Sequence, residues 1–221
     1  MQIALLGGTG DIGEGIALRV ARDTDHAVVV GSRDPDKAAT VASGYSDTLA
    51  DHGIDAAVEG VANPDAAAGA DVVVLAVPAY YLADTIEAVA DALGNAVLVS
   101  PAVGMQRDED GMHYNPPGVG SVTELAASSA PDGVPVVGAF HNLAAGRLGD
   151  LDADLDWDVP VVGDDDAAKD TVTDLLAGIE GLRPLDAGGL ANAAEVESLT
   201  PLLINLAANN EGLHDLGVKF W

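Results

Sequence analysis

The sequence contains no cysteine and has no long uncharged segment. Without cysteine the chain has neither disulfide bonds nor thiolate metal ligands. The longest stretch without a charge, Ala92–Gln106, includes Gly, Asn, Ser and Pro and is shorter than the roughly 18 apolar residues of a membrane span. The sequence begins MQIALLGG, with no basic segment before the apolar residues. We therefore expect no membrane partner, no secretory signal and a cytoplasmic location.

Basic side chains are also scarce, with nine Lys and Arg against 36 Asp and Glu and a net charge of −27. A surface of this charge repels nucleic acid, so we expect no nucleic-acid partner. The 48% hydrophobic content argues against disorder. The composition favours a halophilic protein, because self-repulsion is screened in molar salt, where the Debye length is about 3 Å.

Several catalytic and metal motifs are missing. No Tyr-x-x-x-Lys pair, G-x-S-x-G elbow or Walker lysine is present, and the five histidines lack the spacing of metal ligands. The run Asp164–Asp166 is typical of a helix N-terminus. Asp108–Asp110 with His113 fits a solvated loop better than a cation site. We expect no metal.

Strand and helix patterns alternate along the chain, which predicts an α/β fold. We expect a Rossmann-type parallel sheet with helices on both faces over residues 1–140, and a smaller C-terminal α/β domain over residues 141–221. The expected strands are Gln2–Leu6, Ala27–Gly31, Ala56–Gly60, Asp71–Val77, Ala96–Ser100, Val134–Phe140, Val159–Val162 and Leu182–Asp186. The expected helices are Asp11–Arg22, Pro35–His52, one after Pro78, Asp164–Gly178, and a segment from Leu190. Pro101–Gly120 is predicted to be a long active-site loop.

A glycine motif follows the first predicted strand. Its residues are Gly8, Thr9, Gly10, Asp11, Ile12 and Gly13, which match G-x-G-x-x-G. The motif is weak alone, but here it joins an apolar strand to an amphipathic helix, as dinucleotide binding requires. In that interpretation Gly8 allows the turn, Gly10 lets the backbone approach a pyrophosphate, and Gly13 lets the helix pack closely. The phosphates would bind the free N–H groups at the helix N-terminus.

The end of the second strand indicates which dinucleotide binds. An NAD site usually has an acidic residue here, whereas this chain has Ser32 and Arg33, with Lys37 one helical turn later. Arg33 can form a bidentate contact with a 2′-phosphate, Ser32 can donate a hydrogen bond, and Lys37 adds positive charge. The sequence predicts NADP(H) as the cofactor.

Candidate substrate contacts follow the strands that end near Val77 and Phe140. Val77 and Pro78 lie where ligands bind in such sheets, and so does His141. His141 could contact a substrate or merely complete a hydrogen bond, and the sequence favours neither.

The C-terminal helical segment holds further candidates. Pro201 either kinks this helix or begins it with Thr200 as its cap, and capping is the simplest role for Ser198 and Thr200. Its leucines, among them Leu202, could serve either the core or the interface of a homo-oligomer.

Blocks along the whole chain resemble the NADPH-dependent coenzyme F420 reductases, also called 8-hydroxy-5-deazaflavin:NADP oxidoreductases. These blocks are GGTGDIG, VVVGSRDPDKA, AFHN, DWDVPVVGDDDAAK, GLRPLDAGGLANA, VESLTPLLINL and the terminal GLHDLGVKFW. Within that family the chain resembles haloarchaeal members. The resemblance implies reversible hydride transfer between NADP(H) and the deazaflavin F420, which would bind between the Rossmann domain and the C-terminal domain.

The resemblance also assigns residues. It implies nucleotide contacts from Thr9, Gly10, Ser32, Arg33 and Lys37 and a deazaflavin pocket lined by His141, Ser198 and Thr200. These three side chains would position the ring, because the two cofactors carry the reaction themselves. The chain departs from the family pattern at Ala194, where Arg is common, and at Gly189, where Pro is frequent.

Two other functions fit part of the sequence. One is an NADPH-dependent reductase of an imine or small carbonyl, since the pyrroline-carboxylate reductases share the Rossmann half. The other is a non-catalytic, NADP-sensing protein, since glycine loops of this kind also occur in regulators. The C-terminal blocks favour the deazaflavin reductase over both.

Overall fold

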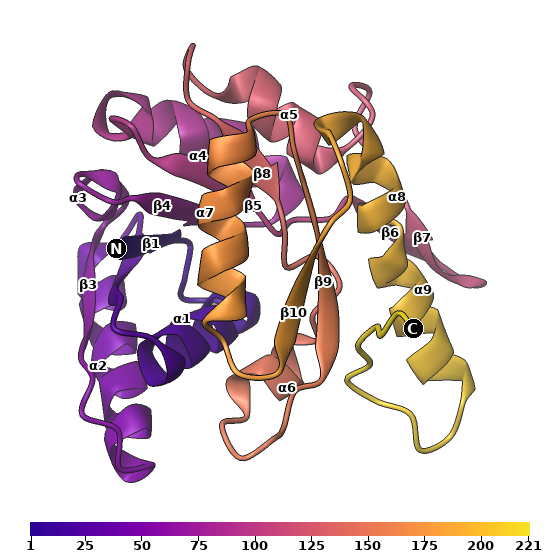
Figure 1. Ribbon diagram of the computed structural model, residues 1–221, viewed down its shortest axis with the longest axis horizontal. Helices are drawn as coiled ribbons and strands as arrows, with labels where there is room; N and C mark the ends of the chain where they lie inside the picture. The colour runs from indigo at the N-terminus through magenta and orange to yellow at the C-terminus, as the bar shows by residue number, and fades with distance from the viewer.

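An eight-stranded sheet forms the centre of the computed structural model, which describes residues 1–221 (Figure 1). The strand order is β10-β9-β8-β5-β4-β1-β2-β3. The strands are β1 Gln2–Leu6, β2 Ala27–Ser32, β3 Val58–Ala62, β4 Val72–Leu75, β5 Val97–Ser100, β8 Val136–Gly138, β9 Trp157–Gly163 and β10 Leu182–Asp186. All neighbouring strands are parallel except β8 and β9. The predicted α/β fold with a Rossmann-type sheet is confirmed.

Helices cover both faces of the sheet. They are α1 Asp11–Asp23, α2 Pro35–Asp51, α3 Asn63–Ala67, α4 Leu82–Val89, α5 Val122–Ser129, α6 Ala145–Gly149, α7 Asp166–Ala177, α8 Ala193–Glu197 and α9 Leu199–Asn209. Of these, α3, α5 and α6 were not predicted. Two have only five residues, too few to show a helical period of apolar positions.

Alternation along the buried strands produces two cores. Ile3 and Leu5 of β1 face the larger cluster, whereas Ala4 and Leu6 face the smaller one on the other side. Both faces of a parallel sheet are covered, which explains the continuous apolar runs in the sequence. The larger cluster also includes Leu176 of α7, so residues from both halves of the chain share it.

The segment predicted as a long loop contains a hairpin. β6 Met105–Asp108 and β7 Gly111–Tyr114 pair antiparallel and lie beside α9 (Figure 1). The side-chain amide of Asn205 on α9 bonds the backbone N–H and C=O of Met112, at 2.8 and 2.7 Å. The prediction of an irregular loop was wrong because this support comes from 93 residues away.

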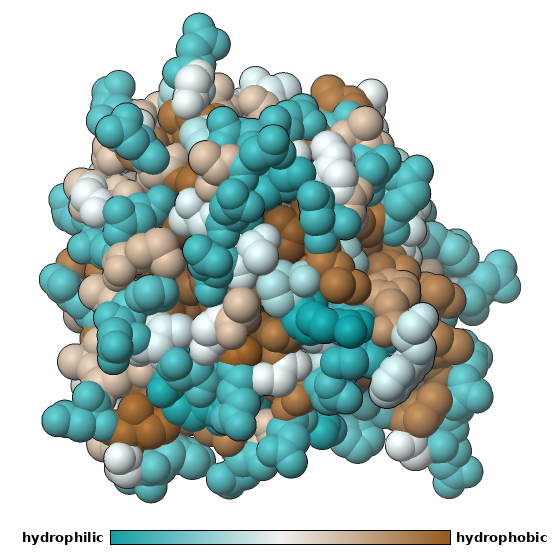
Figure 2. Space-filling view, in the orientation of Figure 1, coloured by the Kyte–Doolittle hydropathy of each residue, from teal (hydrophilic) through white to brown (hydrophobic).

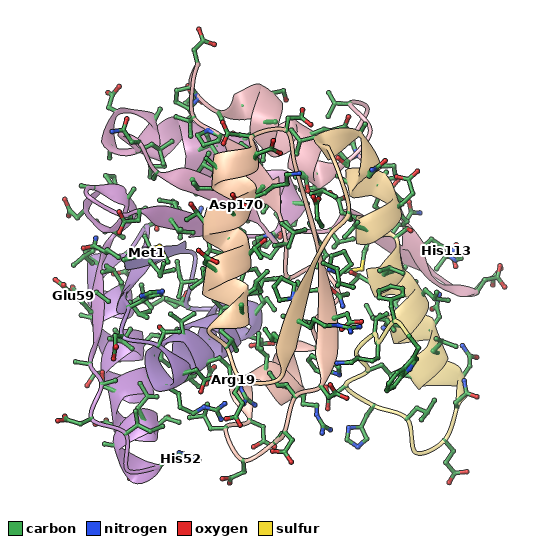
Figure 3. The ribbon with its side chains drawn as sticks, viewed as in Figure 1. Met1, Arg19, His52, Glu59, His113 and Asp170 are labelled. Carbon is green, nitrogen blue, oxygen red and sulfur yellow. The ribbon has the colours of Figure 1, made fainter.

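The short α6 is fixed to α1 by Arg19, whose side chain is only 1% exposed (Figure 3). Its guanidinium donates to four backbone carbonyls, those of Arg147, Leu148, Asp150 and Ala153. A buried arginine normally needs such partners, because an unpaired buried charge is costly. This contact holds residues 147–153 against α1, whose N-terminus carries the glycine loop.

The face of the molecule shown in Figure 2 is largely hydrophilic, with apolar patches between hydrophilic side chains. One patch lies over α9, where Leu202 is 54% and Leu206 is 42% exposed. No helix is long and apolar enough to cross a membrane.

Candidate active site

The glycine loop makes a tight connection between β1 and α1. Gly7 has a φ of +71°, a conformation that glycine adopts without strain. A Cβ on Gly13 would lie 2.5 Å from the Cα of Gly8, so α1 packs directly on the loop. At Gly10 a Cβ would meet only a carbonyl oxygen, at 3.9 Å. The loop therefore leaves space in front of Gly10, which caps α1 without a side-chain hydrogen bond.

A cleft of about 430 Å³ opens at the carboxyl ends of β1, β2 and β4. The predicted residues that line it are Thr9, Gly10, Ser32, Arg33, Lys37, Val77 and Pro78. Strand β1 lies between β2 and β4, at the point where the strand order reverses and where ligands bind in such sheets. The other predicted residues, Gly8, Asp11, Ile12 and Gly13, form the loop and the first turn of α1 and do not line the cleft.

Arg33 and Lys37 are the two cations of this cleft, and neither makes a salt bridge. Both side chains are exposed. They remain without an acidic partner although acidic residues outnumber basic ones fourfold in this chain. The Arg33 guanidinium lies over the ring of Tyr81, 5.1 Å from its centroid. Such a contact orients the guanidinium and leaves its N–H groups available for an anion.

Four polar side chains that were not predicted also line the cleft, namely Asn63, Tyr81, Asp84 and Thr85. Asn63 is 6% exposed, and its Oδ1 has no hydrogen-bond partner. It follows β3, the strand next to β2, so the order of the strands brings it beside Ser32. The sequence offered one signal, a polar residue directly after a strand, but that strand was placed two residues too early.

A strained turn follows β8. Phe140 is buried and has a φ of +67°, which is unusual for an aromatic residue and costs about 1–3 kcal/mol. The turn places His141 in the interior, 3% exposed, with Nε2 3.3 Å from Thr123 Oγ1. Burial lowers the pKa of His141 to about 3, so the imidazole is neutral. The next residue, Asn142, donates to the carbonyl of Asp158.

A second cavity, of about 260 Å³, lies between this turn and α9. His141 and Thr200 line it, together with apolar residues that include Leu203 and Ile204. The Thr200 hydroxyl donates to the carbonyl oxygen of His141 at 2.6 Å. The sequence suggested Thr200 as the cap of the C-terminal helix, and this prediction was wrong, because Thr200 lies inside α9.

The junction of α8 and α9 explains the position of Ser198. α9 begins at Leu199, so Ser198 precedes the helix and Pro201 lies in its first turn, where a missing N–H is tolerated. The Ser198 hydroxyl donates to the carbonyl of Glu195 and does not line the cavity. The helical run is interrupted at Ser198, three residues before Pro201, as the alternative of a proline kink predicts.

Glu197 is fully buried at the end of α8. Its carboxylate accepts hydrogen bonds from Tyr114 of the hairpin and from Val122 and Thr123 at the start of α5. Burial and the neighbouring Glu197 raise the pKa of Tyr114, which keeps its phenol protonated. The sequence assigned Glu197 no role, because its partners lie more than 70 residues away.

The titratable side chains outside the cleft and the second cavity form no cluster that could bind a metal ion. His52 and His113 lie on opposite sides of the molecule (Figure 3). His113 contacts Asp108 in the exposed hairpin at 3.0 Å. No group of three or more His, Asp or Glu side chains is arranged to hold a metal ion.

Comparisons with known proteins agree with this geometry. Residues 2–104 match the family described as NADP oxidoreductase coenzyme F420-dependent. The F420-dependent NADP reductase of Methanocaldococcus jannaschii is 39% identical over 93% of this chain and 92% of its own length. The chain belongs to the F420-dependent NADP reductase family. The reductase of Methanothermobacter thermautotrophicus is also 39% identical, over 99% of this chain and 94% of its own.

Solved structures agree with the assignment to F420-dependent NADP reductases. An Arthrobacter protein thought to be an F420-dependent NADP reductase superposes with a TM-score of 0.81 and 30% identity, over 100% of this chain and 99% of its own. A pyrroline-5-carboxylate reductase from Coxiella burnetii has a TM-score of 0.59 and 18% identity, over 96% of this chain and 72% of its own. That second likeness shows a shared fold.

The two positions at which we expected the chain to depart from the family pattern lie near α8. Ala194 is half-buried in α8. Gly189 lies against Asp164, whose Oδ1 would be 2.7 Å from an added Cβ and accepts the backbone N–H of Leu190. The carboxylate occupies the space that a larger residue at 189 would need.

Proposed function

We propose that the protein catalyses reversible hydride transfer between NADP(H) and the deazaflavin coenzyme F420. The observation that carries this proposal is the pair Arg33 and Lys37, which have no acidic partner although the chain is strongly acidic. They lie in one cleft with the glycine loop and the uncapped start of α1. Such a cleft fits the 2′-phosphate of NADP at one end and its pyrophosphate at the other.

The residues of the glycine motif divide this work. Thr9 and Gly10 face the pyrophosphate, and Asp11 and Ile12 form the helical turn whose N–H groups meet it. Gly8 and Gly13 hold the loop against α1. Ser32 completes the 2′-phosphate site, and Val77 and Pro78 form the wall of the cleft after β4.

The second cavity fits the deazaflavin. When bound, the deazaflavin accepts hydride at a ring carbon and a proton at a ring nitrogen. The apolar wall from α9 excludes water, while His141 and Thr200 orient the ring. Ser198 acts by closing the junction that positions Thr200. We assign no proton transfer to His141, because burial lowers its pKa to about 3 and leaves the imidazole neutral near pH 7.

We propose that residues 1–140 bind the nucleotide and that residues 141–221 bind the deazaflavin. The first part contributes every residue that lines the nucleotide cleft, and the second contributes every residue that lines the deazaflavin cavity. We propose that the reaction takes place where the two parts meet.

The decisive experiment mixes the purified protein with NADPH and oxidised F420 and follows the loss of deazaflavin absorbance. Prompt bleaching with NADPH and little with NADH is the expected result. NADPH binding without loss of deazaflavin absorbance would support the nucleotide site but refute the proposed reaction. Turnover of an imine or small carbonyl in the absence of deazaflavin would favour the alternative reductase.

We also propose that the protein is halophilic, acts in the cytoplasm and forms a homo-oligomer. The net charge of −27 supports the first, and the use of two intracellular coenzymes supports the second. The exposed Leu202 and Leu206 on α9 support the third. Light scattering in molar KCl measures the oligomeric state, and a monomer mass would refute an oligomer.

A further inference from the structure

The buried carboxylate of Glu197 receives four hydrogen bonds. The backbone N–H of Val122 and the phenol of Tyr114 donate to Oε2, at 3.0 and 2.9 Å. The backbone N–H and the hydroxyl of Thr123 donate to Oε1, both at 2.9 Å. Both oxygens are therefore satisfied by donors from the hairpin and from the first turn of α5.

This arrangement decides where the Thr123 hydroxyl proton points. A hydroxyl has one proton and can accept through its lone pairs. If that proton pointed at His141, two oxygens would face each other at 2.9 Å in the interior with no proton between them. The proton therefore lies toward Glu197, and Oγ1 presents a lone pair to Nε2 of His141, 3.3 Å away.

The same logic fixes the proton on His141. A neutral imidazole has one N–H, and Nε2 must be the donor because it faces a lone pair. The other ring nitrogen, Nδ1, then carries a lone pair. It is buried and has no partner in the chain, while His141 itself lines the apolar cavity beside α9.

We propose that Glu197 and Thr123 are positioning residues that hold His141 as the Nε2–H tautomer and so fix the orientation of its imidazole at the wall of the deazaflavin cavity. This inference deepens the proposed function and rests on it for the identity of the ligand in that cavity. It assigns a role to a carboxylate that contacts neither cofactor. No proton is transferred, because these hydrogen bonds only fix the tautomer and the orientation of the imidazole.

The first test is nitrogen NMR of protein labelled with ¹⁵N-histidine, in which two-bond couplings distinguish the tautomers. The His141 signals are identified by their loss in His141→Gln. We expect the Nε2–H pattern in the wild type and in Thr123→Ser, and a mixture of tautomers in Thr123→Val. Thr123→Ala is a second variant that removes the hydroxyl without adding volume.

The second test is steady-state kinetics with NADPH and F420. Loss of one neutral hydrogen bond is worth about a factor of five to ten, so Thr123→Val should raise the KM for F420 by that factor. The KM for NADPH should stay unchanged, and Thr123→Ser should restore the wild-type value.

Two results would overturn the inference. One is an unchanged Nε2–H pattern in Thr123→Val, and the other is an equal KM for F420 in the valine and serine variants. If the wild type does not reduce F420 at all, the proposed function and the expected effect on the KM for F420 are both refuted. The NMR pattern then still decides whether Glu197 and Thr123 fix the tautomer.

Discussion

Single residues determine which nucleotide this fold accepts. Arg33 is exposed at the end of β2, stacked on Tyr81 and free of acidic partners. Replacing Arg33 with Ala should weaken NADPH binding by about 1.5–3 kcal/mol, the value of a charged hydrogen bond. NADH binding should hardly change, because NADH lacks the 2′-phosphate. Fluorescence titration with both nucleotides measures the difference.

Arg107 provides a matched control for that measurement. It is also exposed and makes no salt bridge, but it lies on β6, outside the cleft. Arg107→Ala should leave both affinities unchanged. Equal losses of NADPH and NADH affinity in Arg33→Ala would show that Arg33 does not contact the 2′-phosphate.

Gly13 is a second position at which a single added carbon atom should affect both stability and nucleotide binding. A methyl group there would lie 2.5 Å from the backbone of Gly8, so Gly13→Ala forces α1 away from the loop. We expect a loss of about 1–3 kcal/mol in stability, as in overpacked interiors, and weaker NADPH binding. Thermal unfolding and nucleotide titration measure the two effects.

Gly44 is the matched control for Gly13. It also lies inside a helix, α2, but a Cβ there would meet nothing within 4 Å. Gly44→Ala should raise stability by up to about 1 kcal/mol, because alanine favours a helix. A Gly13→Ala protein as stable as Gly44→Ala would contradict the close contact between α1 and the loop.

At the scale of elements, the C-terminal tail is fixed to β9 by Asp158. Its buried carboxylate accepts two hydrogen bonds from Arg183 of β10, at 2.7 and 2.6 Å, and one from the backbone N–H of Phe220. The hydrogen bonds from Arg183 lower the pKa of Asp158 to about 2. This cluster joins the sheet to the tail that borders the second cavity.

Asp158→Asn should lower the free energy of unfolding by about 1.5–3 kcal/mol near neutral pH. An aspartate in the unfolded chain has a pKa of about 3.9, above its value in the folded protein. The stabilisation is therefore complete above the pKa of the unfolded chain, about 3.9. It is lost as the pH falls from about 4 toward the folded-state pKa of about 2. Urea unfolding of wild type and variant at neutral pH and near pH 3 should show the difference narrowing.

Asp156 separates this effect from a general loss of charge. It is exposed and contacts only Lys219. Asp156→Asn should change stability by well under about 1 kcal/mol, as surface ion pairs do. A similar loss in both variants would mean that burial of Asp158 adds nothing.

At the scale of the whole molecule, the excess of carboxylates opposes folding. Raising KCl from about 0.1 M to about 1 M shortens the Debye length from about 10 Å to about 3 Å. The unfolding temperature should rise over this range, because repulsion within the compact state is screened. The gain should shrink near pH 4, where many carboxylates are protonated. A salt-independent unfolding temperature would refute adaptation to high salt.

The sequence predicted some parts of this molecule closely and missed others. The strand Leu182–Asp186 has the predicted bounds, and α1 and α2 differ from prediction by one residue at one end. The hairpin of Met105–Tyr114 was missed, because its support comes from Asn205. The nucleotide cleft was largely anticipated, whereas Asn63 and Glu197 were not.

The difference has a physical reason. The sequence by itself determined the parallel sheet, the glycine loop and the cation pair after β2, because each depends on residues within a few positions of one another. Only the tertiary structure decided which polar side chains from distant segments form hydrogen bonds with one another. Thr123, His141 and Glu197 come from three separate segments, and their hydrogen bonds exist only once α5, β8 and α8 have packed together.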